Sequence, residues 1–132
     1  MLIGINETDP RPIFVQIVVE VKDQIRRGLL RPGDELPSVR ELAATLGINL
    51  HTVHRAYQKL RDEGVIRLRL GRRARIAPPK QRPLNQELAE TEIAGRLQEL
   101  ITDAYHLGLS TRELRRMVDG LLQAQEEGEA KP

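Results

Sequence analysis

The sequence predicts an α+β fold that is mostly helical, with a small N-terminal domain followed by a pair of helices. Apolar residues recur at helical spacing in several segments, and a short stretch between residues 66 and 76 alternates as strands do. A proline-rich stretch, residues 78–83, separates the two parts. At 132 residues the chain has room for one small domain with an appendage.

Charge divides the chain near the same place. Residues 11–83 contain 16 lysines and arginines against 7 acidic residues, whereas residues 84–132 contain 5 against 10. A polyanion would therefore bind the N-terminal part and be repelled by the tail. Aromatic residues make up only 2% of the chain, which argues against a stacking platform for single-stranded nucleic acid.

Composition excludes several functional classes. The chain has no cysteine, so disulfide scaffolds and thiolate sites for metals or catalysis are excluded. No apolar run approaches the roughly 20 residues that span a bilayer, and the start of the chain lacks the basic and apolar parts of a secretory signal. We therefore expect a soluble cytoplasmic protein with no membrane partner.

The N-terminal part should begin with a packing helix. Residues 2–5 alternate weakly, which predicts a short edge strand. Pro12 favours a helix start, and Gly28 ends the helical spacing that follows. The buried face of this helix is expected to contain Ile13, Ile17, Val18, Val21, Ile25 and Leu29. Residues 30–34, with a proline and a glycine, then form a turn.

A second and a third helix follow, joined by a tight turn. Ser38 and Glu41 have the spacing of a capping box, so a helix should begin at Ser38 and end at Gly47. Asn49 can cap a helix that continues to Gly64. The two buried faces are expected to contain Val39, Leu42, Ala43, Leu46, Val53, Ala56, Tyr57 and Leu60. The exposed first turn of the later helix would then be free to enter the DNA major groove.

Behind this pair the pattern changes to alternation. Residues 66–70 alternate apolar residues with arginine, and residues 74–76 return in the same way. The expected apolar face is Ile66, Leu68 and Leu70. Gly71 and Arg72 can make the reversal, which gives a hairpin, or wing, whose tip with Arg72 and Arg73 can reach the minor groove or flanking phosphates. The alternative is that the arginines only protect an edge strand from aggregation.

Four motifs keep a fixed order between Pro12 and Ile76. They are PIFVQI, GLLRPGDELPSVRELAATLGIN, TVHRAYQKLRDEG and the strand pair around Gly71. This segment, roughly half of the chain, resembles the winged-helix domain of the GntR family of bacterial transcription regulators. The helical tail resembles that of the YtrA subfamily, which implies a small dimerisation region. The family usually has a second glycine at the wing tip, where this chain has Arg73.

The resemblance implies a set of DNA contacts. Arg40 matches an arginine that family members place on the DNA backbone, and residues 49–52 and 54 match the reading positions of the second helix of the pair. Physically, Thr52 can donate to a phosphate or pack its methyl against thymine, while histidines can donate to purine acceptors. The expected DNA-binding set is Ser38, Arg40, Asn49, Leu50, His51, Thr52, His54, Arg55, Arg72 and Arg73. The alternative, a metal ion held by the two histidines, lacks further ligands nearby.

The tail pattern predicts two amphipathic helices. The first runs for about twenty residues to Gly108. Ser110 and Glu113 repeat the capping-box spacing at the start of the second, which should end near Ala124 and leave a frayed end over residues 126–132. The two apolar stripes are Leu88, Ile93, Leu97, Leu100, Ile101 and Ala104, and then Leu114, Met117, Val118, Leu121 and Leu122.

Two helices cannot by themselves bury both stripes, so the tail requires a partner. A second copy of the tail would give a two-fold dimer, and docking on the winged domain is the alternative. The expected dimer residues are Leu88, Ile93, Leu97, Leu100, Ile101, Leu114, Val118 and Leu121. The expected organisation is a winged DNA-binding domain over residues 1–77, a linker over 78–83 and a dimerisation region over 84–125.

The expected function is a sequence-specific, double-stranded DNA-binding transcription regulator. It should be a homodimeric repressor on an inverted-repeat operator, because two half-sites add their binding free energies. The alternative is a winged-helix module that binds protein, which the basic charge and polar first turn oppose. A nucleophile–base pair, a glycine-rich phosphate loop and a metal cluster are all missing, so we expect neither an enzyme nor a cofactor. A small-molecule effector, if one exists, would sit in a crevice between subunits or between tail and wing.

Overall fold

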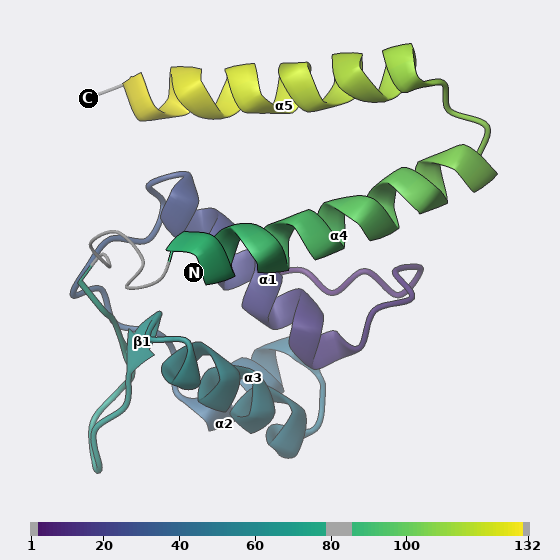
Figure 1. The fold of residues 1–132 in the computed structure, drawn as a ribbon. Coiled ribbons are helices and arrows are strands. Elements are labelled where there is room, and N and C mark those ends of the chain that lie inside the picture. The colour runs from purple at the N-terminus through teal and green to yellow at the C-terminus, as the bar shows by residue number, and fades with distance from the viewer. Residues whose placement is uncertain (1–2, 79–85, 131–132) are drawn as a thin grey trace. The chain divides into compact units, whose positions relative to one another are not determined.

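A computed structural model describes residues 3–78 and 86–130, with side chains to residue 127. The elements are α1 (Ile13–Arg26), α2 (Val39–Leu46), α3 (Leu50–Asp62), β1 (Ile66–Arg67), β2 (Arg75–Ile76), α4 (Gln86–His106) and α5 (Thr111–Ala130) (Figure 1). The predicted α+β, mostly helical fold is confirmed. The chain divides into two compact units, residues 1–80 and 81–132, and most of the expected linker, residues 79–83, lies outside the described residues.

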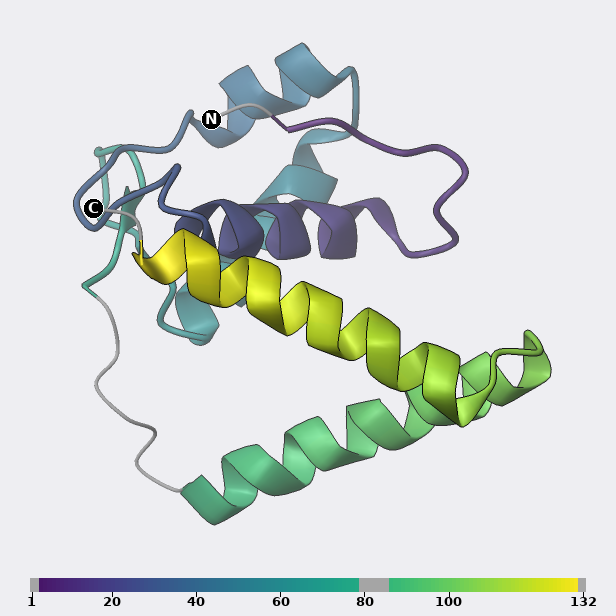
Figure 2. The ribbon, with the colours of Figure 1, turned by 90° about the horizontal axis from the view of Figure 1, so that it is seen from above.

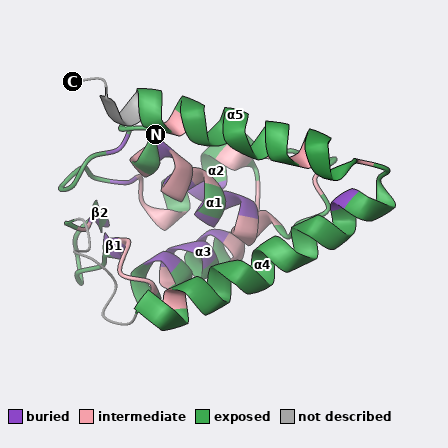
Figure 3. Cartoon of the chain, turned by 45° about the horizontal axis from the view of Figure 1, so that its top comes forward, coloured by how far each residue is buried: buried purple, intermediate pink, exposed green. Residues whose placement is uncertain are grey.

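The N-terminal unit has its own apolar core. Helices α1 and α2 both pack against α3, and the buried residues concentrate where they meet (Figure 3). The largest fully buried side chains are Tyr57, Ile17, Leu36, Leu60, Ile66, Val21 and Val53. One core prediction is wrong, because Leu29 is 61% exposed while Leu30 is buried at 6%. Helix α1 ends at Arg26, and Gly28 has a left-handed backbone with a φ of +77°. Leu29 therefore no longer lies on the buried face of the helix.

The wing is shorter than the alternation predicts. Strands β1 and β2 are antiparallel and pair Ile66 with Ile76 and Arg67 with Arg75. The expected apolar face of residues 66–70 is wrong beyond Ile66, because Leu68 is 37% exposed and Leu70 is fully exposed. The reversal also comes earlier than expected: Arg69 O accepts from Arg72 N at 3.1 Å, so residues 70 and 71 are the central residues of the turn.

A third segment extends this small sheet. Leu36 N donates to Ala74 O at 2.9 Å, and Ile76 N donates to Asp34 O at 2.9 Å. Glu35 and Arg75 form an isolated antiparallel bridge between the same two segments. The loop before α2 is therefore fixed to the returning strand of the wing.

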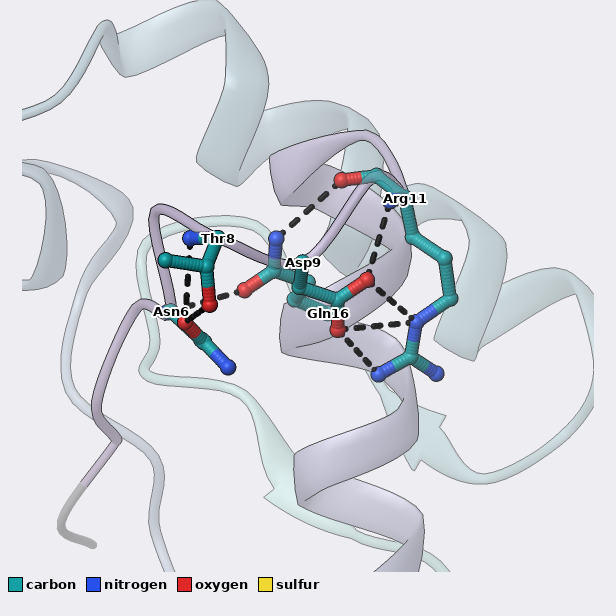
Figure 4. Close-up of polar contacts among 5 residues, drawn as sticks. All are labelled: Asn6, Thr8, Asp9, Arg11 and Gln16. Atoms are coloured by element: carbon teal, nitrogen blue, oxygen red, sulfur yellow. Dashed lines mark hydrogen bonds and ion pairs between the residues drawn. The ribbon is translucent and has the colours of Figure 1, made fainter.

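The residues before α1 form a hydrogen-bonded loop instead of the expected edge strand. Ile3 and Ile5 do pack against the core, but the described residues 3–6 contain no strand. The backbone N–H of Asn6 donates to Gln16 Oε1 at 3.1 Å, and Gln16 Nε2 donates to Arg11 O at 3.1 Å (Figure 4). Gln16 thus fixes both ends of this loop to α1.

The C-terminal unit consists of α4 and α5. Ser110 Oγ accepts from Glu113 N and Glu113 Oε2 accepts from Ser110 N, both at 3.1 Å, so the predicted capping box is present. Helix α5 continues to Ala130, beyond the end expected near Ala124. The two helices diverge from the turn at Gly108 and do not pack closely over the described residues (Figure 2). Among the described residues, none of the helices has the length and apolar character needed to cross a membrane.

Candidate nucleic-acid interface

Helix α2 begins with the predicted capping box. Ser38 Oγ accepts from Glu41 N at 3.1 Å, and Glu41 Oε2 accepts from Ser38 N at 3.4 Å. This exchange satisfies two backbone donors that a helix start leaves open. Arg40 lies in the first turn, is exposed, and forms no ion pair within the described part of the chain. Its guanidinium is therefore available to a phosphate.

The turn between α2 and α3 depends on Gly47. Gly47 has a φ of +66°, which side-chain-bearing residues rarely adopt. Ile48 N then donates to Ala43 O at 3.0 Å, and Gly47 N donates to Ala44 O at 3.3 Å. This pattern closes the last turn of α2, and Ile48 packs against the core. The backbone is thereby redirected within three residues into the start of α3.

Asn49 caps α3, as predicted. Its Oδ1 accepts from His51 N at 2.8 Å, and its backbone O accepts from Thr52 N at 3.1 Å. We call residues 49–55 the reading turn. Within it Thr52 is half-buried, while Asn49, Leu50, His51, His54 and Arg55 are exposed. The cap uses the oxygen of the Asn49 side chain and leaves its amide donors for a ligand.

Neither histidine of the reading turn is part of a metal-ligand cluster. The described residues contain no group of three or more His, Cys, Asp or Glu side chains that could hold a metal ion. His51 and His54 are both solvent-exposed on the first turns of α3. Their ring nitrogens are accessible to an approaching base edge.

Tyr57 fixes α3 against the start of α2. Its side chain is 1% exposed, and its hydroxyl donates to Pro37 O at 2.6 Å. Burial, with a smaller contribution from the Glu41 carboxylate, raises the pKa of the Tyr57 phenol well above its ordinary value. The phenol therefore remains a hydrogen-bond donor. The sequence indicated that Tyr57 belongs to the core but did not identify Pro37 as its acceptor.

Arg55 is held by α1. Its guanidinium carbon lies 3.9 Å from the centre of the Phe14 ring, within the range of a cation–π contact. Arg55 was expected among the DNA-binding residues, and the structure places it at the edge of the reading turn against this ring. On its buried face, α3 contributes Val53, Ala56 and Leu60 to the core, as predicted.

The two arginines of the wing tip have different surroundings. Arg73 Nη1 and Nη2 donate to Glu41 Oε2 and Oε1 at 2.7 and 2.5 Å. These hydrogen bonds are the main reason that the pKa of Glu41 lies below its ordinary value and that of Arg73 above it. Arg72 is exposed and has no side-chain partner among the described residues.

The structure therefore links the three parts of the predicted site. The Tyr57–Pro37 hydrogen bond joins α3 to the start of α2, and the Glu41–Arg73 pair joins α2 to the wing. Sequence reasoning missed both the Glu41–Arg73 pair and the Arg55–Phe14 contact. The partners are far apart in the chain, and opposite charge alone could not have selected them among the many acidic and basic residues.

Comparisons with known proteins agree with this geometry. The family model described as bacterial regulatory proteins, gntR family, matches residues 14–76. The HTH-type transcriptional repressor YtrA of Bacillus subtilis is 37% identical over 115 residues, which cover 85% of this chain and 88% of that protein.

Solved structures are similar over most of the chain. A transcriptional antiterminator from Listeria monocytogenes EGD-e has a TM-score of 0.81 and 32% identity, covering 95% of this chain and 92% of that one. YtrA from Sulfolobus acidocaldarius, a GntR-family transcription factor, has a TM-score of 0.60 and 37% identity, covering 74% and 99%. The similarity to the first of these structures extends into the helical tail.

Proposed function

The chain belongs to the GntR family of bacterial regulatory proteins and is a DNA-binding transcription regulator, and we propose that it represses transcription as a homodimer on an inverted-repeat operator. The observation that carries the proposal is the reading turn. Asn49, His51 and His54 are exposed and Thr52 is half-buried, while the opposite face of α3 is buried and its start is fixed by the Asn49 cap. This rigid, polar helix end is what the major groove accepts.

Base reading is assigned to the reading turn. His51 and His54 can donate to the N7 or O6 acceptors of purines, and the Thr52 methyl can contact thymine. The amide donors of Asn49 remain free to bond a base or a phosphate. Each well-formed contact of this kind discriminates between bases by about 1–3 kcal/mol.

Backbone binding is assigned to residues around the reading turn. Arg40 and Arg72 are exposed and would contact phosphates on either side of the groove. The Ser38 hydroxyl accepts from the Glu41 backbone, so its own proton can still be donated to a phosphate. These contacts would set position and affinity without selecting a sequence.

We assign dimerisation to the C-terminal unit. Seven of the eight expected dimer residues are 40–71% exposed, and Leu114 is half-buried. Because α4 and α5 diverge, neither helix covers the apolar face of the other. A shallow hollow on α4 is lined by small and branched side chains, including Ala89, Ile93 and Ala94, which could receive apolar side chains of a second copy. We therefore assign DNA binding to residues 1–77, within the first unit, and dimerisation to residues 84–125, within the second.

Repression and location follow from the same reasoning. A dimer on promoter DNA blocks transcription without any further activating surface, and the Bacillus subtilis relative is described as a repressor. We place the protein in the cytoplasm, where its DNA is. A small-molecule effector would bind between subunits or beside the wing, since the tail is too small to enclose a sizeable metabolite.

A gel-shift titration over a salt series tests the proposal. The full chain is mixed with promoter DNA, including the region upstream of its own gene, and with a shuffled duplex of equal length as the control. We expect a dimer complex on one sequence, with affinity falling steeply as salt rises. Equal binding to both duplexes, or no binding at low salt, would contradict a sequence-specific repressor.

A further inference from the structure

Five arginines of the wing line one hollow of about 230 Å³. They are Arg67, Arg69, Arg72, Arg73 and Arg75. Two are neutralised, because Arg73 pairs with Glu41 and Arg75 pairs with Glu35 at 2.5 Å. The side chains of the other three form no ion pair within the described residues. The lining therefore carries three positive charges that no acidic side chain balances.

The strand pairing explains why Arg75 is paired and Arg67 is not. Arg67 of β1 lies directly opposite Arg75 of β2. Like charges directly opposite each other destabilise an antiparallel pair. The Glu35 carboxylate and Gly33 O draw the Arg75 guanidinium to one side, at 2.5 and 2.8 Å. Arg67 has no acidic partner among the described residues, so its charge remains available to an anion in the hollow.

Arg73 is committed to a different contact. Both of its terminal nitrogens donate to the Glu41 carboxylate, a two-bond geometry that fixes the plane of the guanidinium. Glu41 is itself held by its place in the capping box of α2. The pair therefore joins the returning side of the wing to the helix turn that carries Arg40. Donors that point at Glu41 are not available to a phosphate.

We propose that Arg67, Arg69 and Arg72 hold DNA phosphates at the hollow, and that Arg73 is a positioning residue that fixes the wing against α2 through Glu41. The inference rests on the proposed DNA-binding function. It adds Arg67 and Arg69 to the DNA contacts and removes Arg73, which the sequence had placed among them.

The salt dependence of operator binding tests this division. Each arginine is changed singly to glutamine, so that every variant loses the same charge. Arg67→Gln, Arg69→Gln and Arg72→Gln should each reduce the slope of log affinity against log salt by about one unit per subunit. Arg73→Gln should leave the slope unchanged. A reduced slope for Arg73→Gln, or an unchanged slope for the other three, would overturn the proposal.

Glu41→Gln separates positioning from simple repulsion. Glutamine keeps the capping acceptor for Ser38 N but loses the ion pair. We expect operator affinity to fall about two- to five-fold, as for Arg73→Gln, with the double variant no weaker than either single one. If Glu41 only repelled DNA, Glu41→Gln would strengthen binding and the positioning role would be wrong.

Two controls keep other failures apart. Inorganic triphosphate is titrated onto the wild type and the same arginine variants without DNA. If the arginine variants lose triphosphate binding but keep the wild-type slope of log DNA affinity against log salt, the hollow would be a site for a free anion, and the proposal would be overturned. A wild-type protein that binds all duplexes equally would instead defeat the proposed repressor function, whatever the arginine variants do.

Discussion

The two units of this protein use apolar residues in opposite ways. In the N-terminal unit, helices α1, α2 and α3 bury side chains such as Ile17, Tyr57 and Leu60 almost completely. In the C-terminal unit, Ala104 is the buried residue among those described, and the larger apolar side chains of both helices are exposed. The first unit therefore has its own core, whereas the second offers apolar surface that only another chain segment can cover.

The largest expected effect comes from the core of the first unit. Leu60→Ala removes a fully buried side chain of α3 and should lower the free energy of unfolding by about 3 kcal/mol. Leu100→Ala, at a position 60% exposed, is the matched change in the tail and should instead shift the subunit equilibrium. Denaturant unfolding at two protein concentrations distinguishes a loss of core stability from a shift of the subunit equilibrium, because only the second depends on concentration. Equal effects of both changes would mean that the units do not differ in this way.

Breaking the tail interface should come next. Leu97→Asp combined with Leu121→Asp places charges on the exposed stripes of α4 and α5, which should give folded monomers in analytical ultracentrifugation. Gln98→Asp with Gln123→Asp adds the same charge beside the stripes and should remain dimeric. If the Leu97→Asp, Leu121→Asp variant remains dimeric, the dimer interface does not lie on these stripes.

Changes in the reading turn and in the first turn of α2 should alter DNA binding and leave assembly intact. His54→Ala should cost about 1–3 kcal/mol of discrimination at one base position, because its lost contact is to a base edge. Arg40→Ala should weaken binding to every sequence and lower the salt slope by about one unit per subunit. Binding to single-base operator variants measures both effects. Intact binding by Arg40→Ala would contradict the proposed docking.

The smallest expected effect is on acid stability. The hydrogen bonds from Arg73 lower the pKa of Glu41 in the folded protein, so the stabilisation is complete above the ordinary glutamate pKa and is lost as pH falls below about 4. Glu41→Gln should therefore narrow the difference in melting temperature between pH 6 and pH 3. Glu87→Gln on α4 serves as the control. If both variants change the melting-temperature difference equally, the Glu41–Arg73 pair is not the source of the acid sensitivity.

Local signals predicted most of the fold. Ser38 with Glu41, Gly47 and Asn49 each act within a few residues, so their caps and turn could be identified from spacing alone. The reading turn followed from these boundaries. The alternation predicted a strand that is too long. Residues 68–70 continue the apolar–arginine pattern after β1 has ended, and Leu68 and Leu70 are exposed. Apolar residues at a wing tip have the same period as those in a longer strand.

Contacts between distant residues could not be predicted in the same way. Arg73 lies 32 residues from Glu41, and its partner depends on where the turn at Gly71 directs the returning strand. The expected edge strand at residues 2–5 failed for a related reason. The apolar residues Ile3 and Ile5 do reach the core, but the loop that follows them is held by the Gln16 side chain, which bonds Asn6 and Arg11, and side-chain amides leave no periodic signal.

The stacking of Arg55 on Phe14 holds this guanidinium against α1, at the edge of the reading turn. If Arg55 stays on α1 when DNA is bound, the proposed base contacts fall on residues 49–54, about one and a half turns of α3, and each subunit would have a short footprint. A short footprint recurs often by chance in a genome. Selectivity would then depend on the separation and orientation of two such footprints, and hence on how rigidly the paired tails hold their DNA-binding ends apart.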